Sequence, residues 1–413
     1  MKKVLLTIMF VGALTACDAD KSEDTTEYTN PISINLSEVE QKLAAEGQTF
    51  GMELFAAVMK AESKKENIVI SPLSLNIALA MVWNGANGDT RAAIQEAMGM
   101  SNYPQETVNA YFKKLKEILL QTDPTTKLSL ANSIWSRKGF PFKDSFFSIN
   151  REWYEAQVSE LDFNDPGAID IINKWCSDNT NGLIKEMVQQ IPSDIVMYLM
   201  NALYFKGCWS DGFGFPAAST ADADFTKTDG STIKVKMMSQ KSKQQYYTDE
   251  NLALTSIPYG NGAFRMVFVL PNGSFDALTE QLKTAGYLST CLNSAHSTEV
   301  NLYIPKFKTG YEIKLNEPLE TLGMGMAFTY FADFSGISDI RLCISEVKQK
   351  TYIDVNEEGT EAAAVTSVGM GLTSVNPTPQ PATFRADRPF LFLIQETSTN
   401  IILFEGKIGA PEY

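Results

Sequence analysis

Histidine is almost absent from this sequence, and that absence narrows the chemistry open to the chain. His296 is the one histidine among 413 residues, and it lies in the polar segment NSAHSTE. A Ser-His-Asp or Cys-His catalytic site would depend on this imidazole, yet no GxSxG or HExxH pattern accompanies it. We interpret His296 as a surface residue and expect that the chain is not an enzyme.

Cysteine is scarce as well, and its spacing contains no metal or redox motif. The chain has 5 cysteines and no CxxC pair. Those of the chain body are Cys176, Cys208, Cys291 and Cys343. Such isolated positions are typical of buried free thiols or of a disulfide that depends on the fold, and the sequence leaves both open. We expect neither a metal site nor a cofactor.

Positive charge is in deficit, because 35 Lys and Arg face 49 Asp and Glu and leave a formal net charge of −14. Nucleic-acid binding draws its affinity from clustered Lys and Arg, so we expect no nucleic-acid partner. Lys113, Lys114 and Lys116 form a small basic group beside Glu117. We interpret this group as a solvated helix face.

The sequence has no apolar run long enough to span a bilayer, and its most apolar stretch is a short one at the N-terminus. MKK precedes VLLTIMFVGAL, which is shorter than the roughly 20 apolar residues that span a bilayer and is typical of a secretion signal. The run ends in LTAC, which resembles the bacterial lipobox, and Cys17 is then the lipidated residue. We predict a lipoprotein signal peptide over residues 1–16. An ordinary signal peptide with a chance cysteine is the alternative.

The segment after Cys17 is acidic and polar, DADKSEDTTEYTN, and it has too few apolar residues to fold. We expect residues 17–45 to form the lipidated cysteine and a tether, with a lipid anchor through Cys17. The predicted location is that of an exported bacterial lipoprotein in the cell envelope. The outer membrane or cell surface is favoured over the periplasmic face of the inner membrane.

The remaining residues, 46–413, contain no repeat and no internal linker. Apolar residues recur at helical spacing from Phe50, NIVI reads as a short strand, and Ser71-Pro72 predicts an N-cap and first helical residue. After about residue 195 the chain becomes rich in β-type runs. These runs are LMNALYFKG, STIKVKMM, LALTSIPY, FRMVFVLP, EVNLYIPKF, KTYIDVN and PFLFLIQE. The pattern predicts a mixed α+β domain with extensive sheet.

One connection in the β-rich half is too long for an ordinary loop. It contains EEGTEAAAVTSVGMGLTS over residues 357–374, without proline and with a single charge beyond Gly359. Read with the period of a strand, it has an uncharged face. That face consists of Thr360, Ala362, Ala364, Thr366, Val368 and Met370. The segment can therefore become a strand, although composition alone also allows a disordered linker or a short alanine helix.

EEGTEAAAV resembles the hinge of the serpins, protease inhibitors that trap a target by inserting a cleaved loop into their own sheet. Other serpin-like motifs follow in the family's order across residues 46–413. They are NIVISPLSLNIALAMVWNGANGDT, KLSLANSIW, INKWCSDNTNGLIKEMV, MNALYFKGCW, IPKF, ADFSGIS and ADRPFLFLI. The resemblance implies a monomeric α+β serpin fold, with helices packed on three β-sheets and an exposed reactive-centre loop at about 357–383.

The resemblance also implies roles for individual loop residues. The hinge residues are Glu357, Gly359, Thr360, Ala362, Ala363 and Ala364. Gly359 matches the flexible hinge glycine, and Thr360 matches the small residue that is buried first when the cleaved loop inserts. The family's spacing places the reactive bond between Thr373 and Ser374, with Leu372 and Met370 as alternative bait residues.

Four further residues match positions that the family uses in sheet opening. Ser74 and Asn201 match hydrogen-bonding positions beneath the opening sheet, Trp209 matches the tryptophan where insertion begins, and Gln349 belongs to the sheet-opening cluster. Gln349 occupies a place where the family usually has histidine, and glutamine hydrogen-bonds without titrating, so we do not expect pH-sensitive opening. The implied function is a suicide-substrate inhibitor of serine proteases, with elastase-like or subtilisin-like targets. A non-inhibitory, serpin-like binding or structural lipoprotein is the alternative.

Overall fold

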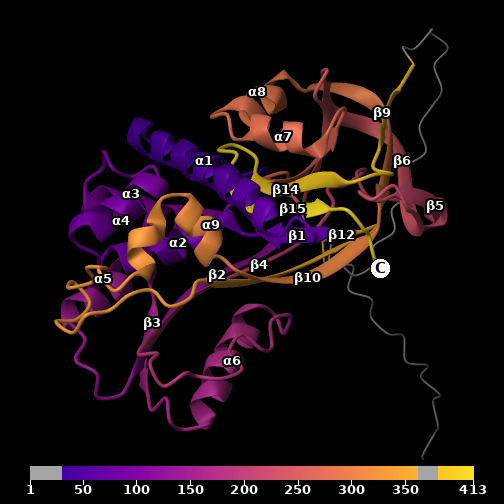
Figure 1. Cartoon of the computed structure of the whole chain (residues 1–413). Helices are drawn as coiled ribbons and strands as arrows, with labels where there is room; N and C mark the ends of the chain where they lie inside the picture. Colours follow the sequence, from indigo (N-terminus) through magenta and orange to yellow (C-terminus); the bar gives the residue numbers. More distant parts are fainter. Residues whose placement is uncertain (1–29, 361–379) are drawn as a thin grey trace, which may run out of the picture.

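The computed structural model describes residues 30–360 and 380–413, and most of its early elements are helices (Figure 1). The helices are α1 (Glu38–Ala61), α2 (Pro72–Trp83), α3 (Gly88–Ala97), α4 (Gln105–Leu119), α5 (Asp144–Tyr154), α6 (Gly167–Asn179), α7 (Phe275–Leu282), α8 (Tyr287–Ser294) and α9 (Asn316–Thr321). Two short 3₁₀ helices are η1 (Ala217–Ser219) and η2 (Met324–Phe328). Ser71 caps α2 and Pro72 opens it, which confirms the predicted start of that helix.

The strands confirm the predicted β-rich second half and add strands within the first half. They are β1 (Asn67–Ile70), β2 (Lys127–Arg137), β3 (Gln157–Leu161), β4 (Met197–Cys208), β5 (Ala221–Thr226), β6 (Thr232–Thr248), β7 (Leu252–Tyr259), β8 (Phe264–Pro271), β9 (His296–Pro305), β10 (Phe307–Lys314), β11 (Lys348–Val355), β12 (Gly359–Thr360), β13 (Ala382–Arg385), β14 (Phe390–Glu396) and β15 (Ile402–Ile408). His296 is exposed at the start of β9, as expected of a surface residue.

Hydrogen bonding joins these strands into two sheets within the described residues. A 6-stranded sheet has the order β10-β11-β12-β4-β2-β3, and a 9-stranded sheet has the order β1-β15-β14-β8-β7-β6-β9-β13, with β5 paired to β6. The resemblance implied three sheets, and two of these are joined here into the single 9-stranded sheet. The reason is the 17-residue strand β6, which pairs with β5 at its start and with β7 at its end.

The helices cover both faces of the 6-stranded sheet. Figure 1 shows α1 and α2 on the side shared with the 9-stranded sheet and α6 on the opposite side. On that outer face, Trp175 of α6 meets Trp135 of β2 edge to face, with 6.2 Å between ring centroids. Helix α2 is buried along most of its length. Both faces of the 6-stranded sheet are therefore covered by helices (Figure 1).

The folded part starts earlier than residue 46, the boundary taken from the sequence. Helix α1 begins at Glu38, where Ser37 and Glu40 form a capping box, so part of the expected 17–45 tether is helical. In the basic group, Lys114 pairs with Glu40 and Lys116 pairs with Glu155. Among residues 30–360 and 380–413, no helix has both the length and the apolar content to cross a bilayer.

The open question about cysteine pairing has an answer for the four cysteines of the chain body. Cys176, Cys208, Cys291 and Cys343 all carry free thiols. Cys176 and Cys291 are buried, and Cys343 is exposed. Burial raises the pKa of the Cys176 thiol to about 12, so this residue behaves as a small apolar side chain.

Candidate functional site

The hinge residues form a two-residue strand, β12, inside the 6-stranded sheet. Gly359 pairs with Cys208 and Thr360 pairs with Gly207, both on β4. On its other side, Thr360 pairs with Val355 of β11, and both pairings are antiparallel. The resemblance implied that Thr360 is buried when the cleaved loop inserts. In the structure Thr360 is already buried, with 3% of its surface exposed.

Glycine is required at the first position of this strand. Gly359 has φ of +152°, and a Cβ there would lie 2.1 Å from the backbone oxygen of Gly207 and 2.8 Å from Cα of Cys208. Neither backbone atom can move without distorting β4. The predicted role of Gly359 as the hinge glycine therefore has a steric basis, since any side chain would force the hinge out of the sheet.

A buried aromatic pair holds the second hinge residue. The Thr360 hydroxyl lies 2.5 Å from the Tyr259 hydroxyl. Tyr259 is fully buried and stacks on Trp209, with ring centroids 4.5 Å apart and planes at 17°. Burial raises the pKa of Tyr259 far above its ordinary value, so the phenol keeps its proton. Trp209 thus lies at the entry point, as the resemblance implied, while Tyr259 carried no sequence signal.

Backbone hydrogen bonds fix the three residues before the hinge. The Trp209 backbone N–H donates to the Glu358 carbonyl at 2.8 Å, and its indole N–H donates to the Asn356 carbonyl at 3.1 Å. The Phe215 N–H donates to the Glu357 carbonyl at 2.9 Å. These contacts come from the chain directly after β4. The polypeptide entering β12 is therefore held from the β4 side.

The side chain of Glu357 adds an ion pair to this entry point. Lys306, at the corner between β9 and β10, places its ammonium 2.9 Å from the Glu357 carboxylate, and both side chains are largely buried. Thr220 donates a hydrogen bond to the same carboxylate at 2.8 Å. Burial alone would raise the pKa of Glu357, but Lys306 and Thr220 outweigh it and lower the pKa. Burial and the nearby Glu357 charge raise the pKa of Glu358.

We use the word seam for the boundary between strands β11 and β4, which begins at β12 and continues beyond it. In the part of the chain that the structure describes, no ladder of hydrogen bonds joins β11 to β4 directly. The upper end of the seam is occupied by β12. The lower part extends toward Lys348 on β11 and Met197 on β4.

Gln349 and Ser71 form the polar contact beneath the lower part of the seam. The Gln349 side chain accepts from the Ser71 N–H and donates to the Ser71 carbonyl, both at 2.9 Å. Thr351, the next inward residue of β11, donates to the Val69 carbonyl at 2.7 Å. Sequence reasoning recognised Ser71 as a helix cap and missed this second role.

The expected sheet-opening cluster is only partly brought together. The Ser74 N–H donates to the Ser71 side chain at 3.3 Å, so Ser74 contacts the same turn. Asn201 donates to the Asn132 side chain at 2.6 Å. Among the described residues, neither Ser74 nor Asn201 hydrogen-bonds to Gln349. The Asn201 side-chain oxygen is buried and has no hydrogen-bond partner in the part of the chain that the structure describes.

The remaining predicted residues lie outside the described part of the chain. They are the small hinge residues Ala362, Ala363 and Ala364, the bait candidates Met370, Leu372 and Thr373, the following Ser374, and the lipidation candidate Cys17. Their assignments remain predictions from the sequence.

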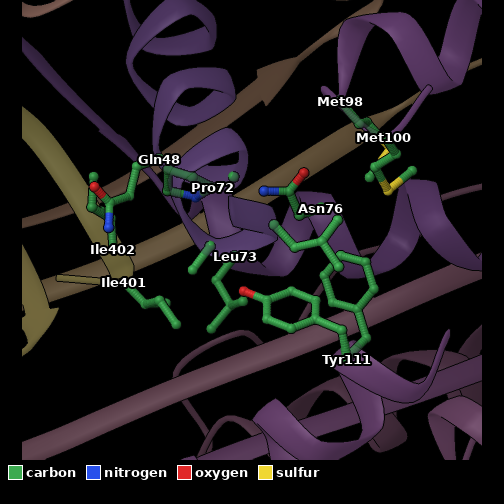
Figure 2. A pocket seen from close by; sticks show the side chains of 13 residues that line it. Gln48, Pro72, Leu73, Asn76, Met98, Met100, Tyr111, Ile401 and Ile402 are labelled. Atoms are coloured by element: carbon green, nitrogen blue, oxygen red, sulfur yellow. The ribbon is translucent and has the colours of Figure 1, made fainter. Parts of the chain in front are cut away.

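A small cavity lies away from the hinge, between α1, α2, α4 and the β15 side of the fold (Figure 2). Asn76 and Tyr111 turn polar groups toward it, and Leu73, Met98 and Ile401 supply apolar walls (Figure 2). Its volume of about 30 Å³ suits one or two waters, and ligand pockets are about ten times larger. The hinge and seam are therefore the stronger candidate for function.

Comparison with known proteins agrees with this geometry. The family model described as "Serpin (serine protease inhibitor)" matches residues 45–411. Iripin-3 of Ixodes ricinus is 34% identical over 93% of this chain and 98% of its own length. The leukocyte elastase inhibitor of Bos taurus is 34% identical over 90% of this chain and 100% of its own.

The fold is also similar to a solved structure. Tengpin, a thermophilic serpin in its native state, gives a TM-score of 0.81 at 35% identity and covers 92% of this chain and 97% of that chain. The family model, the relatives and the hinge strand between β11 and β4 all agree. The chain belongs to the serpin family.

Proposed function

We propose that this protein is a suicide-substrate inhibitor of serine proteases. The observation that carries the proposal is β12, because the hinge residues Gly359 and Thr360 already form an antiparallel strand at the upper end of the seam, and below it no ladder joins β11 to β4 among the described residues. The name of the leukocyte elastase inhibitor, a relative of the chain over 90% of its length, supports an inhibitory role. It also favours an elastase-like target over a subtilisin-like one.

In the chemical step, the serine hydroxyl of the protease attacks the carbonyl of Thr373. The peptide bond to Ser374 breaks, the new amine at Ser374 takes a proton, and an ester joins Thr373 to the protease serine. No cofactor takes part. The loop is then free at its Thr373 end and can continue the strand that β12 begins.

The register of β12 predicts where each inserted residue would lie. Thr360 faces Val355 and Gly207, and each later loop residue would face one position earlier on both strands. Gln349 lies six residues before Val355, and Asn201 lies six residues before Gly207. Thr366, six residues after Thr360, is therefore expected between them. Its hydroxyl would give the buried Asn201 oxygen the partner that it lacks.

The hydrogen bonds formed by continuing the strand would supply the driving free energy of this mechanism, and the cost of ordering the loop offsets much of it. About a dozen new backbone hydrogen bonds at roughly 1 kcal/mol each give on the order of 10 kcal/mol before the cost of ordering the loop. A typical protein is stable by about 5–15 kcal/mol, so the two quantities are comparable. Displacing catalytic groups by about 1 Å costs roughly 100-fold in rate, and the ester then persists.

We also propose that the protein is exported and anchored to a membrane through a lipid on Cys17. The support is the sequence alone, since LTAC follows a short apolar run and precedes an acidic tether. Detergent-phase partitioning of the expressed protein tests this, and Cys17→Ser should move it to the aqueous phase. An unchanged distribution would contradict lipidation.

The decisive experiment is to mix the protein with pancreatic elastase, subtilisin and trypsin and to analyse each reaction on a denaturing gel. A covalent complex with elastase or subtilisin is expected, and mass spectrometry of the released peptide should find an N-terminus at Ser374. Protease whose catalytic serine is alkylated is the control. Cleavage without any complex, and without a rise in the melting temperature of the cleaved form, would favour the non-inhibitory alternative.

A further inference from the structure

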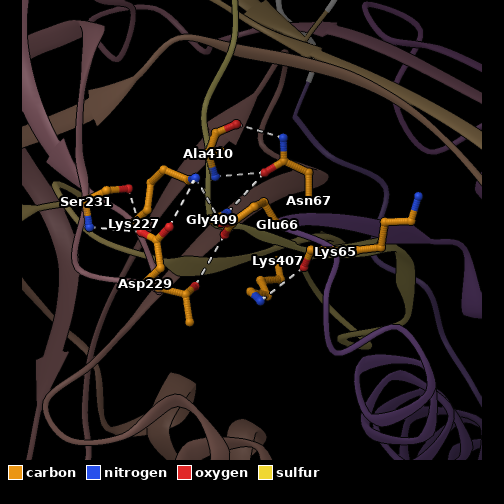
Figure 3. Close-up of polar contacts among 10 residues, drawn as sticks. Lys65, Glu66, Asn67, Lys227, Asp229, Ser231, Lys407, Gly409 and Ala410 are labelled. Atoms are coloured by element: carbon orange, nitrogen blue, oxygen red, sulfur yellow. Dashed lines mark hydrogen bonds and ion pairs between the residues drawn. The ribbon is translucent and has the colours of Figure 1, made fainter.

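The last five residues, Gly409–Tyr413, form a C-terminal tail that is fastened along its course. Asn67 of β1 accepts hydrogen bonds from the N–H groups of Gly409 and Ala410 at 3.1 and 3.0 Å and donates to the Ala410 carbonyl at 2.8 Å (Figure 3). The Gly409 N–H also donates to the Glu66 carbonyl at 2.9 Å. The direction of the tail is thus set at its first two residues.

The tail ends beside the hinge. The Lys308 N–H donates to the Glu412 carbonyl at 2.8 Å, which carries the tail along the first residues of β10. Tyr413 then lies with its ring 4.0 Å from the Lys306 ammonium and 5.2 Å from that of Lys308. Figure 1 shows this end of the chain near β12 and β10.

Lys306 is shared between the tail and the hinge. Its ammonium contacts the Tyr413 ring on one side and the Glu357 carboxylate, at 2.9 Å, on the other. A cation over an aromatic face is stabilised by about 0.5–2 kcal/mol, depending on its exposure. The ring also limits the positions open to a long, flexible lysine side chain. Both effects keep the Lys306 ammonium within ion-pair distance of the Glu357 carboxylate.

We propose that Tyr413 is a positioning residue for the hinge, which acts by holding Lys306 against Glu357 and thereby sets how firmly residues 356–360 stay in the sheet. Loss of the Tyr413 ring would then loosen the hinge. The consequence for inhibition rests on the proposed function, whereas the effect on the hinge does not.

The test is amide hydrogen exchange on the full chain, followed for the peptide that covers 356–360 and for a reference peptide in β14. Tyr413→Ala and deletion of Tyr413 should each speed hinge exchange about three- to tenfold. Glu412→Ala, on the same tail, should stay within twofold of wild type, and Tyr413→Phe should keep the part of the protection that the ring over Lys306 supplies while losing the hydroxyl contacts to Asp354 and Asn356. In a Lys306→Ala background, Tyr413→Ala should have no further effect.

Two results would overturn the inference. One is unchanged hinge exchange in both Tyr413→Ala and the deletion variant. The other is equal acceleration of the hinge and of β14, which would make the tail a general stabilising element. Because exchange needs no protease, a wild-type protein that fails to trap any protease would refute the proposed function and leave this result interpretable.

Discussion

The upper and lower parts of the seam between β11 and β4 differ in how their polar groups are satisfied. At the upper end, β12 pairs with both neighbours, and Thr360 and Glu357 have close side-chain partners. In the lower part, Gln349 turns inward to Ser71, and the Asn201 side-chain oxygen has no partner among residues 30–360 and 380–413. The upper end of the seam is therefore better satisfied than the lower part, which is the direction in which the proposed insertion would extend β12.

The largest expected effect comes from placing a charge at the upper end. Thr360→Arg would bury an unpaired guanidinium beside Tyr259, at a cost of several kcal/mol. The strand could not extend, and we expect at least a hundredfold shift from covalent complex to cleaved inhibitor on a denaturing gel. Thr360→Ser, which keeps the hydroxyl, is the matched control. Equal complex from the Arg variant and the control would refute insertion past Thr360.

A smaller but clear effect is expected from filling the space at Gly359. Gly359→Ala would bring a methyl group against the Gly207 backbone, and such overpacking costs about 1–3 kcal/mol. We expect β12 to leave the sheet, with fast amide exchange at residues 359 and 360. Gly310→Ala in β10, where the nearest atom is 3.8 Å away, is the control. If residues 359 and 360 stayed protected from amide exchange in Gly359→Ala, the backbone of β4 near Gly207 would have moved to admit the methyl group.

In the lower part of the seam, Gln349→Ala would leave the buried N–H of Ser71 without its partner, while the Ser71 carbonyl would keep the hydrogen bond from the Leu75 N–H. The expected loss is about 1–3 kcal/mol of unfolding free energy, measured by denaturant titration. Gln349→His is the informative companion, because a buried imidazole resists protonation and the variant should lose stability as pH falls below about 6.5. Wild type should lack this step. If the wild-type protein lost stability over the same pH range, a group other than residue 349 would be responsible for the loss.

The smallest effect concerns the pH dependence of the Glu357 ion pair. The folded-state pKa of Glu357 is lowered, so its stabilisation is complete above the unfolded value of 4.5 and is lost as pH falls through the folded pKa. After correction for the intrinsic pH dependence of amide exchange, the protection factor of the hinge in wild type should therefore fall below pH 4.5. Glu357→Gln should exchange faster at neutral pH and lose that acid step. An acid step of equal size in the variant would contradict the assignment.

The sequence predicted the fold class, and the Ser71-Pro72 start of α2 follows from local backbone requirements and is confirmed. The resemblance named Gly359 as the hinge glycine, and the structure adds a steric reason for glycine there, the close approach of the Gly207 backbone. The start of α1 was also readable, since SEVE from Ser37 to Glu40 fits the capping-box pattern, but the surrounding acidic residues were interpreted as part of the tether.

The contacts that sequence reasoning missed join residues far apart in the chain. Thr360 meets Tyr259 across 101 positions and Gln349 meets Ser71 across 278. No pattern in one sequence specifies such pairings, which depend on strand register. The occupied state of β12 was missed for the same reason, because it depends on how β11 and β4 are spaced by the rest of the sheet.

The corner at Lys306 connects the two sheets mechanically. Its backbone N–H donates to Lys236 of β6 in the 9-stranded sheet, while its side chain reaches Glu357 in the chain that enters the 6-stranded sheet. A rearrangement of the 6-stranded sheet that displaced Glu357 would therefore be felt at the same residue that is hydrogen-bonded to β6.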